Sequence, residues 1–290
     1  MDGMVPPWRP DMVRQRTADA SPAEVERRRP VLERAADNVA VRRLLILVVL
    51  AACWQGYAHV LNNELLVPSF AATVDALWAA IVSGELPARV GNSLGTLLVG
   101  YAGGLLISAL LTGFAVSSRI GTDFLSTLTA MFNPLPAIAL LPLALLWFGL
   151  GAPSLLFVLL HSVVWPVSLN TFSGFQSVAP TLRMAGRNYG LRGFRYVMYI
   201  LVPAAFPAIL TGLKIGWAFA WRTLIAAELV FGSNSGGGGL GWYIFENRNE
   251  LEIPSVFAGL LTVILIGLLV EGVVFRTIEA ATVRRWGMQS

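Results

Sequence analysis

Charged side chains inside an apolar run are the residues of this chain that most clearly point to a specific chemistry. The run from 204 to 231 contains Lys214, Arg222 and Glu228. A charge in such surroundings is costly unless it is paired or faces a cavity. Lys214 and Glu228 would lie about 21 Å apart along one straight helix, so they cannot pair with each other. Arg222, near the middle of the run, would attract an anion.

These polar side chains leave two interpretations open. In the first, Arg222 lines a path for an anionic solute, and other polar groups at the same depth contact that solute. In the second, Arg222 pairs with a carboxylate on a neighbouring helix, and the uncharged groups form hydrogen bonds between helices, which is their commoner role. The candidate path residues are Asn133, His161, Asn170, Arg222 and Glu228.

Catalytic chemistry finds little support in the sequence. A membrane enzyme would need clustered carboxylates or histidines, or a nucleophile with its base. The two histidines, His59 and His161, are far apart, and the single cysteine, Cys53, cannot form a disulfide or a cysteine-based metal site within the chain. No G-x-x-x-x-G-K-[ST] pattern occurs, so we expect no ATP hydrolysis by this chain. We therefore expect a non-catalytic protein that binds no cofactor or metal itself.

A glycine-rich stretch offers a further motif. Gly236, Gly238 and Gly241 match G-x-G-x-x-G, which suggests dinucleotide binding in other settings. Here no predicted strand precedes the glycines and no βαβ unit surrounds them. We expect a flexible loop on the outer face instead.

Composition indicates that these polar groups belong to a membrane protein. Of 290 residues 56% are hydrophobic and 13% are charged, and the mean hydropathy is +0.66, more apolar surface than one soluble core could bury. The net charge of +4 is small and scattered, which argues against a nucleic-acid partner, whereas the apolar composition implies contact with membrane lipid. A helix needs about 20 apolar residues to cross the hydrocarbon core of a bilayer. Six stretches meet or approach that length: 41–61, 93–116, 124–148, 154–175, 204–231 and 254–277.

The fold class that follows is an all-α integral membrane protein with about six transmembrane helices. The third stretch is the least regular, because Pro134, Pro136 and Pro142 should kink it or break its first turns. Before the second stretch, Val74, Leu77, Trp78 and Ile81 recur with helical spacing after Pro68 and Ser69 and before Gly84. This pattern predicts an amphipathic helix on the outer surface, lying on the membrane or on the helix bundle.

The arginines give the orientation of the chain. If residues 1–40 start inside, the cytoplasmic segments hold ten arginines and the outer loops hold only Arg89 and Arg248. By the positive-inside rule both termini then lie in the cytoplasm. The ten are Arg42, Arg43, Arg119, Arg183, Arg187, Arg192, Arg195, Arg276, Arg284 and Arg285. Residues 1–40 hold five prolines, seven arginines and seven acids, so they form a polar cytoplasmic tail, and residues 41–290 form the transmembrane domain.

A basic segment between the fourth and fifth stretches, "TLRMAGRNYGLRGFRYVMYILVPAAFP" (181–207), has four arginines and no acid. Pro180 can start a short helix with Leu182, Ala185 and Tyr189 on one face, which Gly190 is placed to end. A second short helix follows, closed by Pro203. Its apolar side holds Phe194, Val197, Met198 and Leu201. The two helices predict either a phosphate-facing anchor or a docking surface for a cytosolic partner.

A resemblance favours the docking surface. "MAGRNYG", followed by nine residues and "ILVP", resembles the EAA loop of binding-protein-dependent ABC importer permeases, with Met184 in place of the usual glutamate. The stretches "PLPAIALLPLALLWFGLG", "PAAFPAILTGLKIGWAFAWRTLIAAELV" and "GGGLGWYIF" are, in this order, similar to the nitrate, sulfonate and taurine group of these permeases. The resemblance covers about 250 residues and implies the type I ABC importer permease fold.

The resemblance also implies a set of partners. Such importers combine two permease subunits, here expected to be identical copies, with two cytosolic ATPases, which use ATP and Mg, and an outer solute-binding protein. Residues 176–203 would form the coupling loop that contacts the ATPase. The residues carried over from the motif are Arg183, Met184, Ala185, Gly186, Arg187, Gly190, Ile200 and Pro203.

The expected function is therefore the permease subunit of an ABC importer in the bacterial inner membrane. Its solute would be small and anionic: a sulfonate, taurine, nitrate or an aromatic carboxylate. The alternative is an ATP-independent secondary transporter or channel. That class would explain the apolar stretches and the buried charges, but not the basic loop.

Overall fold

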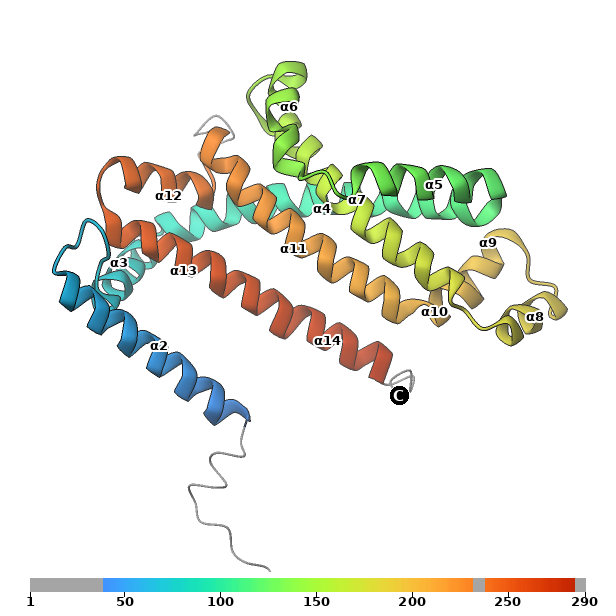
Figure 1. The fold of residues 1–290 in the computed structure, drawn as a ribbon, viewed down its shortest axis with the longest axis horizontal. Coiled ribbons are helices and arrows are strands. Elements are labelled where there is room, and N and C mark those ends of the chain that lie inside the picture. Colours follow the sequence, from blue (N-terminus) through green and yellow to red (C-terminus); the bar gives the residue numbers. More distant parts are fainter. Residues whose placement is uncertain (1–38, 232–237, 285–290) are drawn as a thin grey trace, which may run out of the picture. The chain divides into compact units, whose positions relative to one another are not determined.

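The regular structure of the protein is helical throughout the residues that the computed structural model describes, 39–231 and 238–284 (Figure 1). The fold class predicted from the sequence is confirmed, whereas most of the predicted tail lies outside the described residues. The elements are α2 (Val39–Leu61), α3 (Phe70–Val82), α4 (Glu85–Ser117), α5 (Arg119–Phe132), η1 (Ala137–Leu140), α6 (Leu141–Phe148), α7 (Ala152–Gln176), α8 (Pro180–Asn188), α9 (Gly193–Tyr196), η2 (Val197–Leu201), α10 (Val202–Ala204), α11 (Phe206–Phe231), α12 (Leu240–Asn249), α13 (Ile253–Leu269), η4 (Val270–Phe275), α14 (Arg276–Glu279) and η5 (Ala280–Arg284).

Four of the predicted membrane spans are single helices, and the other two are bent pairs. By length and composition, the segments Val41–Leu61, Glu85–Ser117, Ala152–Gln176 and Ile253–Val283 can each cross a membrane. The third predicted span is broken between α5 and η1 with a bend of 86°. The fifth predicted span, 204–231, is α11, and this helix is bent by 79° from the preceding helical piece Gly193–Ala204, with which it forms the second bent pair. Counting each bent pair as one span gives up to six, as expected.

Prolines account for the first break. Asn133 ends α5, and Pro134 and Pro136 follow before the 3₁₀ turn η1 begins. Proline lacks the N–H that would continue a helical ladder, and Pro136 is in an extended conformation with ψ 123°. Figure 1 shows the result: α5 and α6 run in different directions. The sequence therefore predicted the place of the break.

Glycines allow the central helices to approach closely. α7 packs against both α4 and α11. A Cβ atom on Gly104 of α4 would lie 2.6 Å from Cβ of Val163 in α7, and one on Gly212 of α11 would lie 2.9 Å from Cβ of Asn170. Small residues at such contacts are the usual way for membrane helices to pack. This packing fixes α7 and α11 against each other.

Helix α3 begins and ends as the sequence predicts. The Ser69 hydroxyl accepts a hydrogen bond from the Ala72 N–H at 3.1 Å, and Gly84 follows the helix with a φ of +81°. Leu77 packs on the core, whereas Trp78 is 68% exposed. α4 begins at Glu85, earlier than predicted, so Arg89 lies in this helix and not in a loop. Arg248 likewise lies in α12.

Exposed apolar side chains cover much of the surface. In the first half of α2, Leu44, Leu47 and Leu50 are each at least 60% exposed. Apolar surface of this extent marks an interface with lipid or protein. It agrees with the hydropathy of the segment.

Candidate translocation pocket and coupling segment

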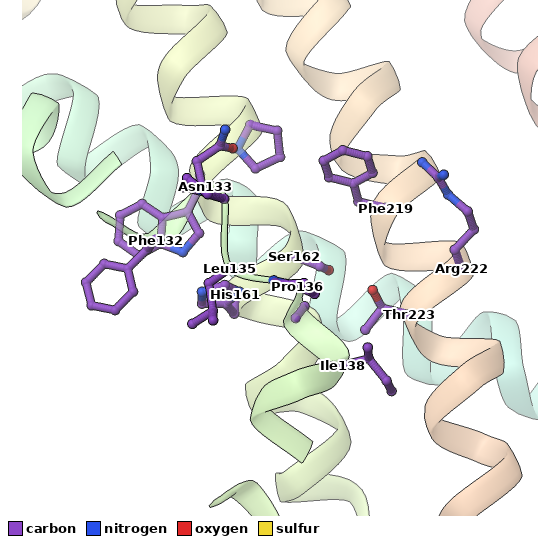
Figure 2. Close-up of a pocket in the computed structure, with 14 residues that line it drawn as sticks. Phe132, Asn133, Leu135, Pro136, Ile138, His161, Ser162, Phe219, Arg222 and Thr223 are labelled. Atoms are coloured by element: carbon purple, nitrogen blue, oxygen red, sulfur yellow. The ribbon is translucent and has the colours of Figure 1, made fainter. Parts of the chain in front are cut away.

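A pocket of about 330 Å³ opens where the third span is broken. Its walls come from the end of α5 and the following turn, from the middle of α7 and from α11 (Figure 2). Three predicted path residues, Asn133, His161 and Arg222, line it together. Asn170 and Glu228 are not among its lining residues.

Arg222 lies on the α11 wall of the pocket with its side chain exposed. Its Nε donates a hydrogen bond to the Ala218 carbonyl at 3.0 Å, and its guanidinium carbon lies 5.1 Å from the centroid of the Phe219 ring. In the part of the chain that the structure describes, no ion pair joins Arg222 to a carboxylate. The guanidinium therefore keeps most of its five donors for another group.

His161 and Trp165 form a second polar patch in the pocket, on α7. The ring nitrogens of both side chains are buried, and none has a hydrogen-bond partner among the described residues. The Trp165 ring stacks on Phe132 of α5 with centroids 5.1 Å apart and planes 17° apart. Buried polar atoms without a partner are uncommon in proteins, so each calls for an explanation such as a ligand.

The two asparagines have different surroundings. Asn133 follows α5 and donates its backbone N–H to the Thr129 carbonyl at 3.0 Å, at the edge of the pocket. The Asn170 amide donates to the Pro166 carbonyl at 2.8 Å, within α7. Because a Cβ atom on Gly212 of α11 would lie 2.9 Å from its Cβ, Asn170 lies at the packed contact between α7 and α11.

Glu228 lies in a buried polar cluster at the end of α11. Its carboxylate accepts hydrogen bonds from the Ser93 hydroxyl at 2.7 and 2.8 Å and from the Gly241 N–H at 2.8 Å. The Ser93 oxygen in turn accepts from the Leu240 N–H at 2.8 Å. Glu228 therefore joins α11 to α4 and to the first turn of α12. We name Ser93, Glu228, Leu240 and Gly241 the Glu228 cluster.

The glycine-rich stretch lets the backbone approach Glu228 closely. A Cβ atom on Gly239 would lie 2.1 Å from a Glu228 carboxylate oxygen, and one on Gly241 would lie 2.5 Å from the Ile225 carbonyl. Gly236 lies outside the described residues. The described glycines thus permit a close approach of backbone to carboxylate, which the sequence prediction of a flexible loop did not include.

The remaining charge of α11 is also paired. Nζ of Lys214 lies 2.7 Å from a Glu279 carboxylate oxygen in α14, and both side chains are partly exposed. The prediction that Lys214 and Glu228 do not pair with each other is confirmed. Of the three charges in this helix, Arg222 alone has no carboxylate or hydrogen-bonded side-chain partner among the described residues.

The basic segment after α7 folds as two short helices separated at Gly190, whose φ is +74°. α8 begins at Pro180, and the second helical piece, α9 to α10, ends at Ala204, one residue after Pro203. Gly186 is the contact between them, because a Cβ atom there would lie 2.8 Å from Cγ1 of Ile200. Arg183 donates to the carbonyls of Val178 and Phe175, and so binds the end of α7.

Apolar side chains of this segment divide into two sets. Val197 and Leu201 pack with Phe175 and Ala205, whereas Phe194 and Met198, predicted to share their side, are 78% and 44% exposed. On α8 the exposed residues include the predicted face and two further motif residues. They are Leu182, Met184, Ala185, Arg187 and Tyr189. We name Leu182, Ala185 and Tyr189, which share one side of the helix, the α8 face.

These features together define a helical membrane component with a polar pocket at a broken span and a projecting pair of short helices. The family model described as "Binding-protein-dependent transport system inner membrane component" matches residues 100–277. The chain belongs to this family. It is the permease subunit of an ABC importer, a multi-pass protein of the inner membrane without a catalytic role. Systems of this kind work with an ATPase and a solute-binding protein.

Individual relatives cover most of the chain. A protein of Escherichia coli (strain K12) that bears the name of an aliphatic sulfonates transport permease, SsuC, is 30% identical over 77% of this chain and 84% of its own length. The nitrate import permease protein NrtB of Synechocystis is 32% identical over 63% of this chain and 65% of its own length. The taurine transport system permease protein TauC of Escherichia coli is 30% identical over 57% of this chain and 61% of its own length.

Proposed function

We propose that this permease carries a small anionic solute and that the solute contacts Arg222, His161 and Asn133 in the pocket. The observation that carries the proposal is that Arg222 lines the pocket and that its guanidinium has no carboxylate partner in the described residues. The relatives' names mention aliphatic sulfonates, nitrate and taurine, which all carry an oxyanion group. The solute class is a sulfonate, taurine, nitrate or an aromatic carboxylate.

The proposal includes an assembly. Two copies of this chain span the membrane with both termini in the cytoplasm, two ATPases bind ATP and Mg below them, and a binding protein delivers the solute from outside. Residues 176–203 form the coupling segment, and the α8 face contacts the ATPase. Its exposed apolar residues support this contact, because such a surface marks an interaction site.

Uptake into proteoliposomes tests the role of Arg222. The complete complex, with its binding protein, is given ATP and the solute that the binding protein captures. We expect Arg222→Gln to reduce uptake about tenfold or more, since the loss of a charge-assisted contact costs about 1.5–3 kcal/mol, and Arg222→Lys to retain an intermediate rate. Arg119→Gln removes the same charge from the exposed start of α5 and is the control. Unchanged uptake in an assembled Arg222→Gln complex would refute the role in the path.

Two neighbouring substitutions test the coupling segment. Met184→Glu restores the residue that resembling permeases have, so the ATPase should still co-purify with this variant. Ala185→Glu places the same charge in the middle of the α8 face and should abolish co-purification, because it buries an unpaired carboxylate in an apolar contact. Equal ATPase recovery with both variants would contradict the proposed docking face. Uptake by this chain alone, without ATP, would contradict the assembly.

A further inference from the structure

The pocket walls are largely aromatic and cyclic. Phe132 and Trp165 stack on one another, and Phe219 extends from α11 together with Arg222, on the other side of the view from Phe132 (Figure 2). Pro134, Pro136 and Pro166 complete much of the remaining wall. Rings of this kind offer flat apolar surface, on which another ring gains stacking energy beyond the area that it buries.

The volume of the pocket exceeds what an inorganic oxyanion needs. About 330 Å³ is the space of roughly ten water molecules, and it falls in the range of about 300–1,000 Å³ that is typical of sites for small organic ligands. A planar anion of four heavy atoms would leave the aromatic walls without contacts. A larger solute with an apolar body would reach both Arg222 and the rings.

The charges of the pocket select for a single negative group. Of its 14 lining residues Arg222 alone is an arginine or lysine, and none is acidic. On α7, the indole N–H of Trp165 and the imidazole of His161 add polar atoms that are buried and have no partner in the described residues. The arrangement therefore combines one cation, buried hydrogen-bonding groups and an apolar wall.

We infer that the permease itself selects its solute, and that the pocket prefers an organic monoanion, a carboxylate or sulfonate on a flat apolar body, over an inorganic oxyanion of the same charge. The inference rests on the proposed function, since it takes the pocket to be the solute site. It adds a selection step inside the membrane component, in addition to the one made by the binding protein.

Direct binding tests this preference in the complex of permease and ATPase, held in lipid nanodiscs without the binding protein. The probes are nitrate, methanesulfonate, benzenesulfonate, benzoate and the neutral benzamide, and the signal is the quenching of tryptophan fluorescence that Trp165→Phe removes. We expect the two aromatic anions to bind at least about tenfold more tightly than nitrate and methanesulfonate, because their rings stack on the aromatic side chains of the pocket. Benzoate should also bind more tightly than benzamide, and this difference should vanish in Arg222→Gln.

Phe219→Ala separates the ring from the charge. It should weaken the binding of benzoate about tenfold and leave the affinity for nitrate unchanged, because only the aromatic body of benzoate contacts the Phe219 wall. Equal affinity for nitrate and benzoate, or equal affinity for benzoate and benzamide, would each overturn the inference. So would no binding of either aromatic anion at about 10 mM, which is about tenfold above the upper end of usual KM values. Such a result together with intact ATP-dependent anion uptake would leave the proposed function standing. Absence of ATP-dependent uptake by the complete complex would overturn the proposed function itself.

Discussion

Arg222 and Glu228 lie less than two turns apart on α11, yet their surroundings are opposite. Glu228 is 4% exposed, and its carboxylate accepts hydrogen bonds from Ser93 and Gly241. Arg222 is exposed in the pocket, and its described side-chain neighbour is the Phe219 ring. A charge that the fold surrounds with donors stabilises the fold, whereas a charge that the fold leaves without a counter-ion is free to bind a solute.

Of the substitutions at these sites, Glu228→Leu should reduce the stability of the permease most. The substitution leaves the Ser93 hydroxyl and the Gly241 N–H without their acceptor, and a buried donor without a partner costs about 1–3 kcal/mol. We expect a loss of about 3 kcal/mol in stability by the same rule, seen as an earlier transition when the purified permease is heated and its monodisperse fraction is measured by size-exclusion chromatography. Glu228→Gln keeps an acceptor and should lose much less. Glu228→Leu with wild-type stability would show that the Glu228 cluster has no structural role.

Gly239→Ala should reduce the stability of the permease less than Glu228→Leu does. The new methyl group would lie 2.1 Å from a Glu228 carboxylate oxygen and 2.4 Å from the Ser93 hydroxyl oxygen, so the cluster must shift. Overpacking of this kind costs about 2 kcal/mol. Gly113→Ala is the control, because no atom outside its own stretch of helix lies within 4 Å of its new methyl group. If both variants show the same thermal transition, the close approach of Gly239 to Glu228 does not contribute to stability.

Arg222→Gln should have the smallest effect on stability. The side chain is exposed and gives up one hydrogen bond to the backbone of its own helix. We expect a change within about 0.5 kcal/mol, measured by the same heating assay, although uptake falls. A loss as large as that of Glu228→Leu would remove the distinction between the two charges.

Local features of this fold follow from the sequence, because local residues determine them. Pro134 and Pro136 predict the break of the third span, Ser69 and Gly84 the limits of α3, and Gly190 the turn after α8. Each depends on a missing N–H, a capping hydroxyl or a φ that glycine tolerates.

The tertiary partners do not follow from the sequence. Ser93 and Glu228 are 135 residues apart, and no periodicity links a serine in α4 to a glutamate in α11. The sequence therefore grouped Glu228 with Arg222 as path candidates, although only Arg222 lines the pocket. A glycine-rich stretch close after a buried acid was the available signal, because a backbone free of Cβ atoms can approach a carboxylate closely. The meeting of Asn133, His161 and Arg222 likewise depends on how three helices pack.

Thiol labelling of two positions on α11 tests the central claim most directly, that the pocket is a positive, water-accessible path and the buried side of α11 is not. In a background with Cys53→Ser, Thr223→Cys places a thiol on the pocket wall and Ala227→Cys places one in a buried position, packed with Ala137 and Leu155. In the assembled complex we predict that an anionic methanethiosulfonate labels Thr223→Cys about tenfold faster than a cationic one of similar size, as expected beside a positive charge, and that Arg222→Gln removes this difference. Ala227→Cys should remain unlabelled. Equal rates for both reagents at Thr223→Cys, or equal labelling of the two positions, would contradict the account.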